Sequence, residues 1–164
     1  MKKIALVAAL AAFSVPAAAA PGDTDTAQGS ATAEIVAPIS ITHTSGAALA
    51  FGTLTAGGGG TVTVTTGGVA TEGGDVSILT GSTNSADSFS VTGDPSRSFS
   101  VSTTSGTVAS GTNQMNFTTA VNNASETLSG TGTFTLRVGG TLTVGASQAP
   151  GNYTGSYDAT VTYN

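Results

Sequence analysis

The sequence predicts an all-β fold, an antiparallel sandwich. Apolar residues recur at every second position through most of the chain, whereas helical spacing is nearly absent. Glycine- and proline-containing turn signals separate these runs at intervals of about ten residues, as in sandwiches and small barrels. The 23 glycines also raise a β-solenoid as an alternative, but no repeat of fixed period supports it. We therefore expect one sandwich of about eight or nine strands.

The chain begins with a segment typical of a Sec signal peptide. Lys2 and Lys3 form a basic start, residues 4–15 are apolar, and residues 16–20 are a small-residue cleavage region. The apolar run is too short to span a bilayer, and no later run approaches ~18 uninterrupted apolar residues. We therefore predict that residues 1–20 are removed on export and that the mature chain has no transmembrane segment.

The remaining chain is predicted to contain one domain. Residues 21–30 (PGDTDTAQGS) form a polar stretch with proline and glycine, which we expect to be flexible. Residues 31–164 have the usual size of a single domain with its own core. The predicted organisation is thus a leader, a flexible polar segment and one β-sandwich domain.

The first predicted strand covers residues 31–41. Its odd positions are apolar: Ala31, Ala33, Ile35, Ala37, Ile39 and Ile41. Its even positions are mostly polar, and they include Pro38, which faces the side opposite the isoleucines and removes one ladder hydrogen bond. Successive side chains of a strand point to opposite faces, so this spacing gives the segment one apolar side. Such a strand docks either in its own domain or in a neighbouring copy.

The later strands follow from the same alternation. The apolar positions that mark them are, in order, Leu49 and Phe51; Val62 and Val64; Val76 and Ile78; Phe89 and Val91; Phe99 and Val101; Met115 and Phe117; Phe134, Leu136 and Val138; Leu142 and Val144; and Tyr157, Ala159, Val161 and Tyr163. Turn signals between them are Gly57–Gly60, Gly67-Gly68, Gly73-Gly74, Gly93-Asp94-Pro95 and Pro150-Gly151.

Composition excludes several classes of function. Without Lys2 and Lys3, two cations remain against nine acids, so the formal net charge changes from −5 to −7. A chain with so few cations has no electrostatic basis for binding nucleic acid. Charged residues make up 8% of the chain, so Ser, Thr, Asn and Gly must cover the surface. The absence of cysteine removes disulfides, thiol catalysis and cysteine-based zinc sites.

Nor does the sequence indicate an enzyme. His43 is the only histidine and lies at the end of the first predicted strand, where we expect no catalytic role. The aspartates Asp75, Asp87, Asp94 and Asp158 are scattered near strand ends and turns, where we expect turn capping and solubility. Their spacing matches no calcium loop, so we expect neither a metal nor a cofactor.

Two segments carry a resemblance to a known family. Phe51-Gly52-Thr53-Leu54, followed by Gly59-Gly60 and Thr61–Val64, is similar to the FGxL…GxVxV pattern of spore-coat-protein-U-like pilins. Gly151-Asn152-Tyr153, followed by Ala159–Tyr163, resembles the closing GxYxD…VTVxY pattern, with Gly155 at the aspartate position. The stretch VGGTLTVGASQAPGNYTGSY is also similar to an uncharacterised family of bacterial secreted proteins, a domain of unknown function.

The resemblance implies a subunit of an archaic chaperone–usher pilus. Such subunits have an immunoglobulin-like sandwich that lacks one strand, and the N-terminal strand of the next subunit completes it. By position, residues 31–41 would be the donor strand, with Ile35, Ile39 and Ile41 as anchors and Ala31, Ala33 and Ala37 where room is short. The implied partners are neighbouring copies, a periplasmic chaperone and an outer-membrane usher. Localisation would be the periplasm and then the cell surface, with a role in adhesion or biofilm.

A second function stays open. Residues 31–41 can pair within their own domain, which would make the protein a monomeric secreted module. Such a module would bind a ligand through glycine-rich loops, of which 57–60 and 67–74 are the candidates.

Overall fold

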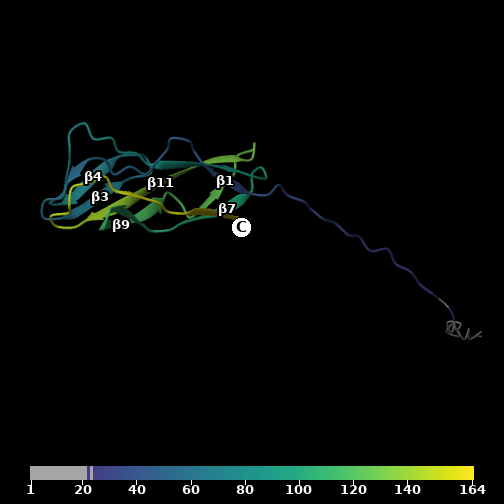
Figure 1. The fold of residues 1–164 in the computed structure, drawn as a ribbon. Coiled ribbons are helices and arrows are strands. Elements are labelled where there is room, and N and C mark those ends of the chain that lie inside the picture. Colours follow the sequence, from purple (N-terminus) through teal and green to yellow (C-terminus); the bar gives the residue numbers. More distant parts are fainter. Residues whose placement is uncertain (1–21, 23) are drawn as a thin grey trace, which may run out of the picture. The chain divides into compact units, whose positions relative to one another are not determined.

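The computed structural model describes residue 22 and residues 24–164 (Figure 1). Its described elements are all strands, paired antiparallel, so the predicted all-β sandwich is confirmed. The chain divides into two compact units, Met1–Glu34 and Ile35–Asn164. In the first unit, residues 24–34 are exposed and form no strand. The predicted signal peptide, residues 1–20, lies outside the described residues.

The main sheet has eight strands. They are β1 (Ser40–His43), β3 (Gly60–Val64), β4 (Ala70–Gly74), β6 (Asp87–Thr92), β8 (Gly106–Ser110), β9 (Asn113–Val121), β11 (Thr133–Val144) and β12 (Thr154–Gly155). The order β1-β6-β11-β9-β8-β12 forms one path, and the β3–β4 hairpin pairs with β11 as well. Two smaller sheets are β10-β7-β13 and β2-β5. Their strands are β7 (Ser98–Thr103), β10 (Ser125–Thr127), β13 (Ala159–Tyr163), β2 (Leu54–Thr55) and β5 (Ser77–Ile78).

Strand β11 joins the two halves of the domain. Its first part, Thr133–Val138, pairs with β6, and its second part, Gly140–Val144, pairs with β3. At the change of partner, a Cβ on Gly139 would lie 2.3 Å from the backbone oxygen of Val64. Only glycine, which has no Cβ, allows the end of β3 to approach this closely. This close approach explains why a glycine occurs in the middle of β11.

Two core clusters correspond to these halves. The first contains Phe51, Val62, Val64, Val76, Met115, Phe117, Leu142 and Val144. The second contains Val91, Phe99, Val101, Leu128, Leu136 and Val138. The inward residues of β11 at even positions contribute to both clusters, because side chains alternate strictly along a strand. The two clusters meet at Tyr157, which packs against each of them.

The structure differs from the sequence prediction in the number of strands. The described residues form thirteen, among them β4, β8, β10 and β12, which the alternation of apolar residues did not reveal. These strands contain few large apolar side chains; β10, for example, reads Ser-Glu-Thr. Gly73-Gly74, expected in a turn, lies at the end of β4 and pairs with β3. Backbone pairing therefore fixes these elements without an apolar pattern, at sheet edges for β4, β10 and β12 and between two strands for β8.

Candidate functional site

The structure divides the six predicted donor positions between two environments. Ile39 and Ile41 are half-buried and pack against the second core cluster, where Ile41 pairs with Val91. The side chains of Ala31, Ala33, Ile35 and Ala37 are exposed, and Ile35 is 97% exposed. The predicted strand over residues 31–41 is thus present in this single chain only from Ser40 onward. Ile39 and Ile41 belong to their own domain here.

The neighbouring strand explains why pairing begins at Ser40. Ser40 pairs with Thr92, the last residue of β6, and the chain then turns through residues 94–97. Strand β6 therefore offers no partner to residues 31–39. Pro38 lacks a backbone donor, and the alanines gain little from burial. Tyr163 Oη also holds Ala37, because it donates a 2.9 Å hydrogen bond to the backbone oxygen of that residue.

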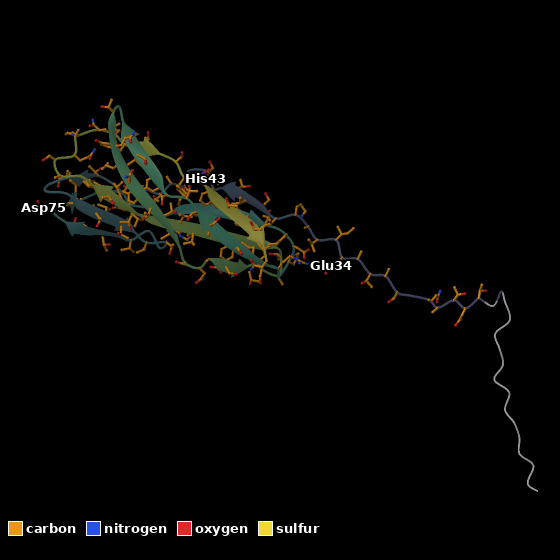
Figure 2. All side chains as sticks on the ribbon, turned by 90° about the horizontal axis from the view of Figure 1, so that it is seen from below. Glu34, His43 and Asp75 are labelled. Carbon is orange, nitrogen blue, oxygen red and sulfur yellow. The ribbon has the colours of Figure 1, made fainter. Side chains whose placement is uncertain are left out.

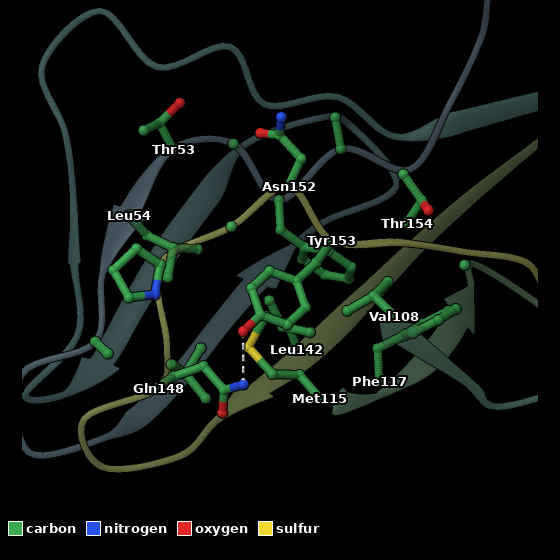
Figure 3. Close-up of a pocket in the computed structure, with 18 of the residues that line it drawn as sticks. Thr53, Leu54, Val108, Met115, Phe117, Leu142, Gln148, Asn152, Tyr153 and Thr154 are labelled. Carbon is green, nitrogen blue, oxygen red and sulfur yellow. Dashed lines mark hydrogen bonds between the residues drawn. The ribbon is translucent and has the colours of Figure 1, made fainter. Parts of the chain in front are cut away.

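An apolar pocket of about 790 Å³ opens over the first core cluster (Figure 3). Met115, Phe117 and Leu142 of the main sheet line it from β9 and β11. Residues 49–56 and residues 148–155 supply the rest of its lining, with Val108, Val144 and Tyr157. No lining residue carries a charge. A pocket of this size and polarity is typical of sites that take an uncharged, mainly apolar group.

Two short strands with unpaired edges border this pocket. Within the described chain, β2 pairs only with β5, and β12 pairs only with β8. Leu54 and Thr55 of β2 line the pocket together with Thr154 and Gly155 of β12. An unpaired strand edge offers a row of backbone donors and acceptors to an added strand. The pocket therefore combines apolar walls with free backbone pairing groups.

The two segments that carry the family resemblance meet at this pocket. Phe51-Gly52-Thr53-Leu54 lines one side, and Gly151-Asn152-Tyr153 lines another. The second segment is held by hydrogen bonds of Tyr153 Oη, which donates to the Ala149 oxygen over 2.7 Å and accepts from Gln148 Nε2 over 2.9 Å (Figure 3). Sequence reasoning singled out both segments but did not predict that they share a site.

Close backbone packing explains the glycine at the position where the closing pattern has aspartate. A Cβ on Gly155 would lie 2.1 Å from the backbone oxygen of Thr107, in the neighbouring strand. Any side chain at this position would force β12 away from β8. Gly155 is therefore required for the edge of the pocket.

A buried carboxylate lies between the two core clusters. Asp87 is 5% exposed, and its Oδ1 lies 2.7 Å from His43 Nε2. Tyr157 Oη donates a 2.8 Å hydrogen bond to Oδ2, and the Ser88 backbone N–H donates to Oδ1 over 2.7 Å. Burial raises the pKa of the Tyr157 phenol, and the hydrogen bond and charge of Asp87 raise it further. The network connects β1, β6 and the segment before β13.

This network corrects the expectation that Asp87 caps a turn. Asp87 begins β6 on the inward side, where its carboxylate is buried and fully hydrogen-bonded. The alternation that places Phe89 and Val91 inward also places Asp87 inward, and this was the signal available in the sequence. Asp75 does lie in a turn, where its Oδ2 accepts a 2.8 Å hydrogen bond from the Gly58 N–H. Asp94 lies in a turn as well, 3.2 Å from Arg97 Nε.

The glycine-rich loops lie outside the apolar pocket. Residues 57–60 contact Asp75, and a Cβ on Gly57 would lie 2.1 Å from the backbone oxygen of Asp75. Gly68, Thr71 and Glu72 border a second and more open pocket of about 610 Å³. Among residues 22 and 24–164, no group of three or more His, Cys, Asp or Glu side chains is arranged to hold a metal. Over the same residues, no helix is long and apolar enough to cross a bilayer.

Together these features define an antiparallel β-sandwich whose second layer is open over one of its two cores. The chain belongs to the family described as a domain of unknown function (DUF4402), whose family model matches residues 39–163. The matched region begins one residue before β1 and ends with β13. No curated protein matches the chain, and no solved structure matches it.

Proposed function

We propose that this chain is a non-enzymatic structural subunit of an exported, pilin-like surface filament or coat. Subunits join by donor-strand exchange, in which the N-terminal segment of one copy adds to the sandwich of the next. The role of the assembly is adhesion or biofilm formation. The partners are neighbouring copies, a periplasmic chaperone and an outer-membrane usher, and export uses the Sec pathway.

One observation carries this proposal. The odd positions of residues 31–37 are all apolar and all exposed, and Ile35 is 97% exposed. Exposed apolar residues that occur singly need no explanation, but a regular apolar face on an extended segment is suited to a sheet. The same chain has a domain with unpaired strand edges and an open apolar pocket.

The energetics favour exchange when the receiving site is otherwise open to water. Burial of one isoleucine side chain contributes ~1.5–3 kcal/mol. Fixing each backbone residue of the segment costs ~1–2 kcal/mol. Backbone hydrogen bonds and the removal of exposed apolar pocket surface from water must supply the remaining stabilisation. A domain with a complete second layer would offer neither of these contributions.

The test compares the exported chain with its Ile35→Asp variant in electron microscopy and size-exclusion chromatography. We expect filaments or large assemblies from the unaltered chain and dispersed domains from the variant. The matched control is Val69→Asp, because Val69 is also exposed, at 63%, but lies outside residues 31–41. A solitary, stable unaltered chain would contradict the proposal.

A second candidate function is a monomeric secreted module that binds a small ligand. The pocket volume of about 790 Å³ favours it, since drug-sized ligands occupy pockets of about 300–1,000 Å³. This function places the ligand between residues 49–56 and 148–155 rather than at the glycine-rich loops. Mass spectrometry of the purified monomer checks it, because a defined small molecule retained in the pocket would support this function.

A further inference from the structure

We infer that the apolar pocket between β2 and β12 is the site that receives Ile35, and that it receives Ile35 only from another copy. This inference rests on the proposed function and adds to it the receiving residues and the direction of assembly. It follows from three features of the domain: the position of the pocket, the point where the N-terminal segment leaves, and the length of chain between them.

Ser40, where the chain enters the sheet, and the pocket lie at opposite ends of β11. Ser40 pairs with Thr92, which pairs with Thr133 at the start of β11. Leu142 and Val144, which line the pocket, lie at the other end of the same strand. Asp75 contacts the loop beside that second end, and Figure 2 shows it far from His43 of β1.

The chain is too short to connect the two within one molecule. With a rise of about 3.3 Å per residue, Leu142 lies roughly 30 Å along β11 from Thr133. The five residues from Ile35 to Ser40 span at most about 18 Å when fully extended. Moreover, β1 runs antiparallel to β6, so residues before Ser40 continue away from the Leu142 end. Ile35 therefore cannot occupy the pocket of its own domain.

The pocket suits the apolar face of the segment. Its lining carries no charge, and Leu54, Val108 and Tyr153 are half-buried, with apolar surface left uncovered. On an inserted strand, Ala33, Ile35 and Ala37 would face this lining, while Glu34 and Val36 would face the other way. The free edges of β2 and β12 supply backbone partners on either side. The apolar lining and the two strand edges together suit a strand in which one branched side chain, Ile35, lies between two alanines.

The arrangement also sets the symmetry of the assembly. Each copy offers a segment at one end of β11 and a pocket at the other. A contact between two different surfaces repeats from copy to copy and does not saturate unless it closes into a ring. Head-to-tail repetition of this contact therefore builds an open chain of subunits.

Site-directed cross-linking tests this assignment, because the chain contains no cysteine of its own. The full chain is made with Ile35→Cys and Leu54→Cys together and treated with a short bis-maleimide. We expect a ladder of covalent oligomers on a denaturing gel. A mixture of chains that carry only Ile35→Cys with chains that carry only Leu54→Cys should give cross-linked dimers and nothing longer.

The matched control is the pair Ile35→Cys and Val69→Cys, since Val69 is exposed but does not line the pocket. A ladder from this control equal to that from the pocket pair would overturn the assignment. Assembly that depends on Ile35 but gives no cross-link to Leu54 would overturn the pocket and leave the proposed function standing. A ladder that stops at two copies would overturn the open head-to-tail chain. Absence of any assembly would overturn both proposals.

Discussion

The two halves of this domain differ in how they are covered. Over the second core cluster, the sheet β10-β7-β13 faces β1, β6 and β11, and Phe99 is completely buried between them. Over the first cluster, residues 49–56, the short strand β5 and residues 148–157 cover β3, β9 and β11, and a pocket of about 790 Å³ remains. One sheet therefore supports a closed half and an open half, and the open half is where we place assembly.

The largest expected effect distinguishes the closed core from the open one. Phe99→Ala should lower the free energy of unfolding by about 3–5 kcal/mol, because Phe99 is 0% exposed and its ring packs against Phe134. Phe117→Ala should lower the free energy of unfolding by less, because Phe117 lines the pocket and makes fewer packing contacts on that side. Urea unfolding of both variants, made in the Ile35→Asp chain, checks this. Equal losses would contradict an open half.

The connection between the halves is tested at Gly139. Gly139→Ala should lower the free energy of unfolding by about 1–3 kcal/mol, because the added Cβ would lie 2.3 Å from the Val64 oxygen. The control is Gly130→Ala, where nothing lies within 4 Å of the added carbon. Thermal unfolding of both variants measures the difference. Equal stability of the two would show that β11 does not require this close approach.

The boundary between the domain and its N-terminal segment is tested at two isoleucines. Ile41→Asp places a carboxylate in the closed half, where burial of an unpaired polar group costs roughly 1–3 kcal/mol. Ile35→Asp should change the free energy of unfolding by less than about 0.5 kcal/mol, because Ile35 is exposed. Urea unfolding of dispersed protein measures both. A large loss for Ile35→Asp would place this residue in the core of its own domain.

The smallest expected effect is a loss of stability at alkaline pH. The pKa of Tyr157 is raised in the folded protein, so folding favours the protonated phenol. This contribution is complete below the unfolded pKa of about 10 and decreases as the pH rises above it. Between pH 9 and pH 11, roughly one unit either side of that pKa, the unaltered chain should therefore lose more stability than the Tyr157→Phe variant. Parallel pH curves would contradict the raised pKa that burial and Asp87 give Tyr157.

The sequence predicted the closed half better than the open half. Strict alternation at Val91, Phe99, Val101 and Leu136 marked strands whose inward residues form the second cluster. Strand β8 and the edge strand β12, which border the pocket, escaped prediction because their small residues give no apolar pattern and backbone pairing fixes them. The prediction of a turn for Asp87 was wrong because a charged residue is rarely buried without a partner. The partners of Asp87 are distant in sequence, so no local pattern indicates them.

The candidate site could be predicted only in parts. The alternation over residues 31–41 was visible, but its division at Ser40 depends on where β6 ends. The segments 51–54 and 151–153 were recognised separately, and a separation of about one hundred residues in sequence hides their contact from any local pattern. Long-range pairing of this kind depends on the topology of the sheet rather than on the residues of either segment.

The most direct test uses the methyl group of Met115, which lines the pocket and is the only methionine besides Met1. The Ile35→Asp chain, labelled with 13C at its methionine methyl groups, is titrated with a peptide of residues 30–41. We expect the Met115 signal to shift and saturate, and the same peptide with Ile35→Asp to leave it in place. A Met115 signal that does not move while the peptide binds would contradict the pocket as the receiving site, and a peptide that does not bind would contradict strand exchange itself.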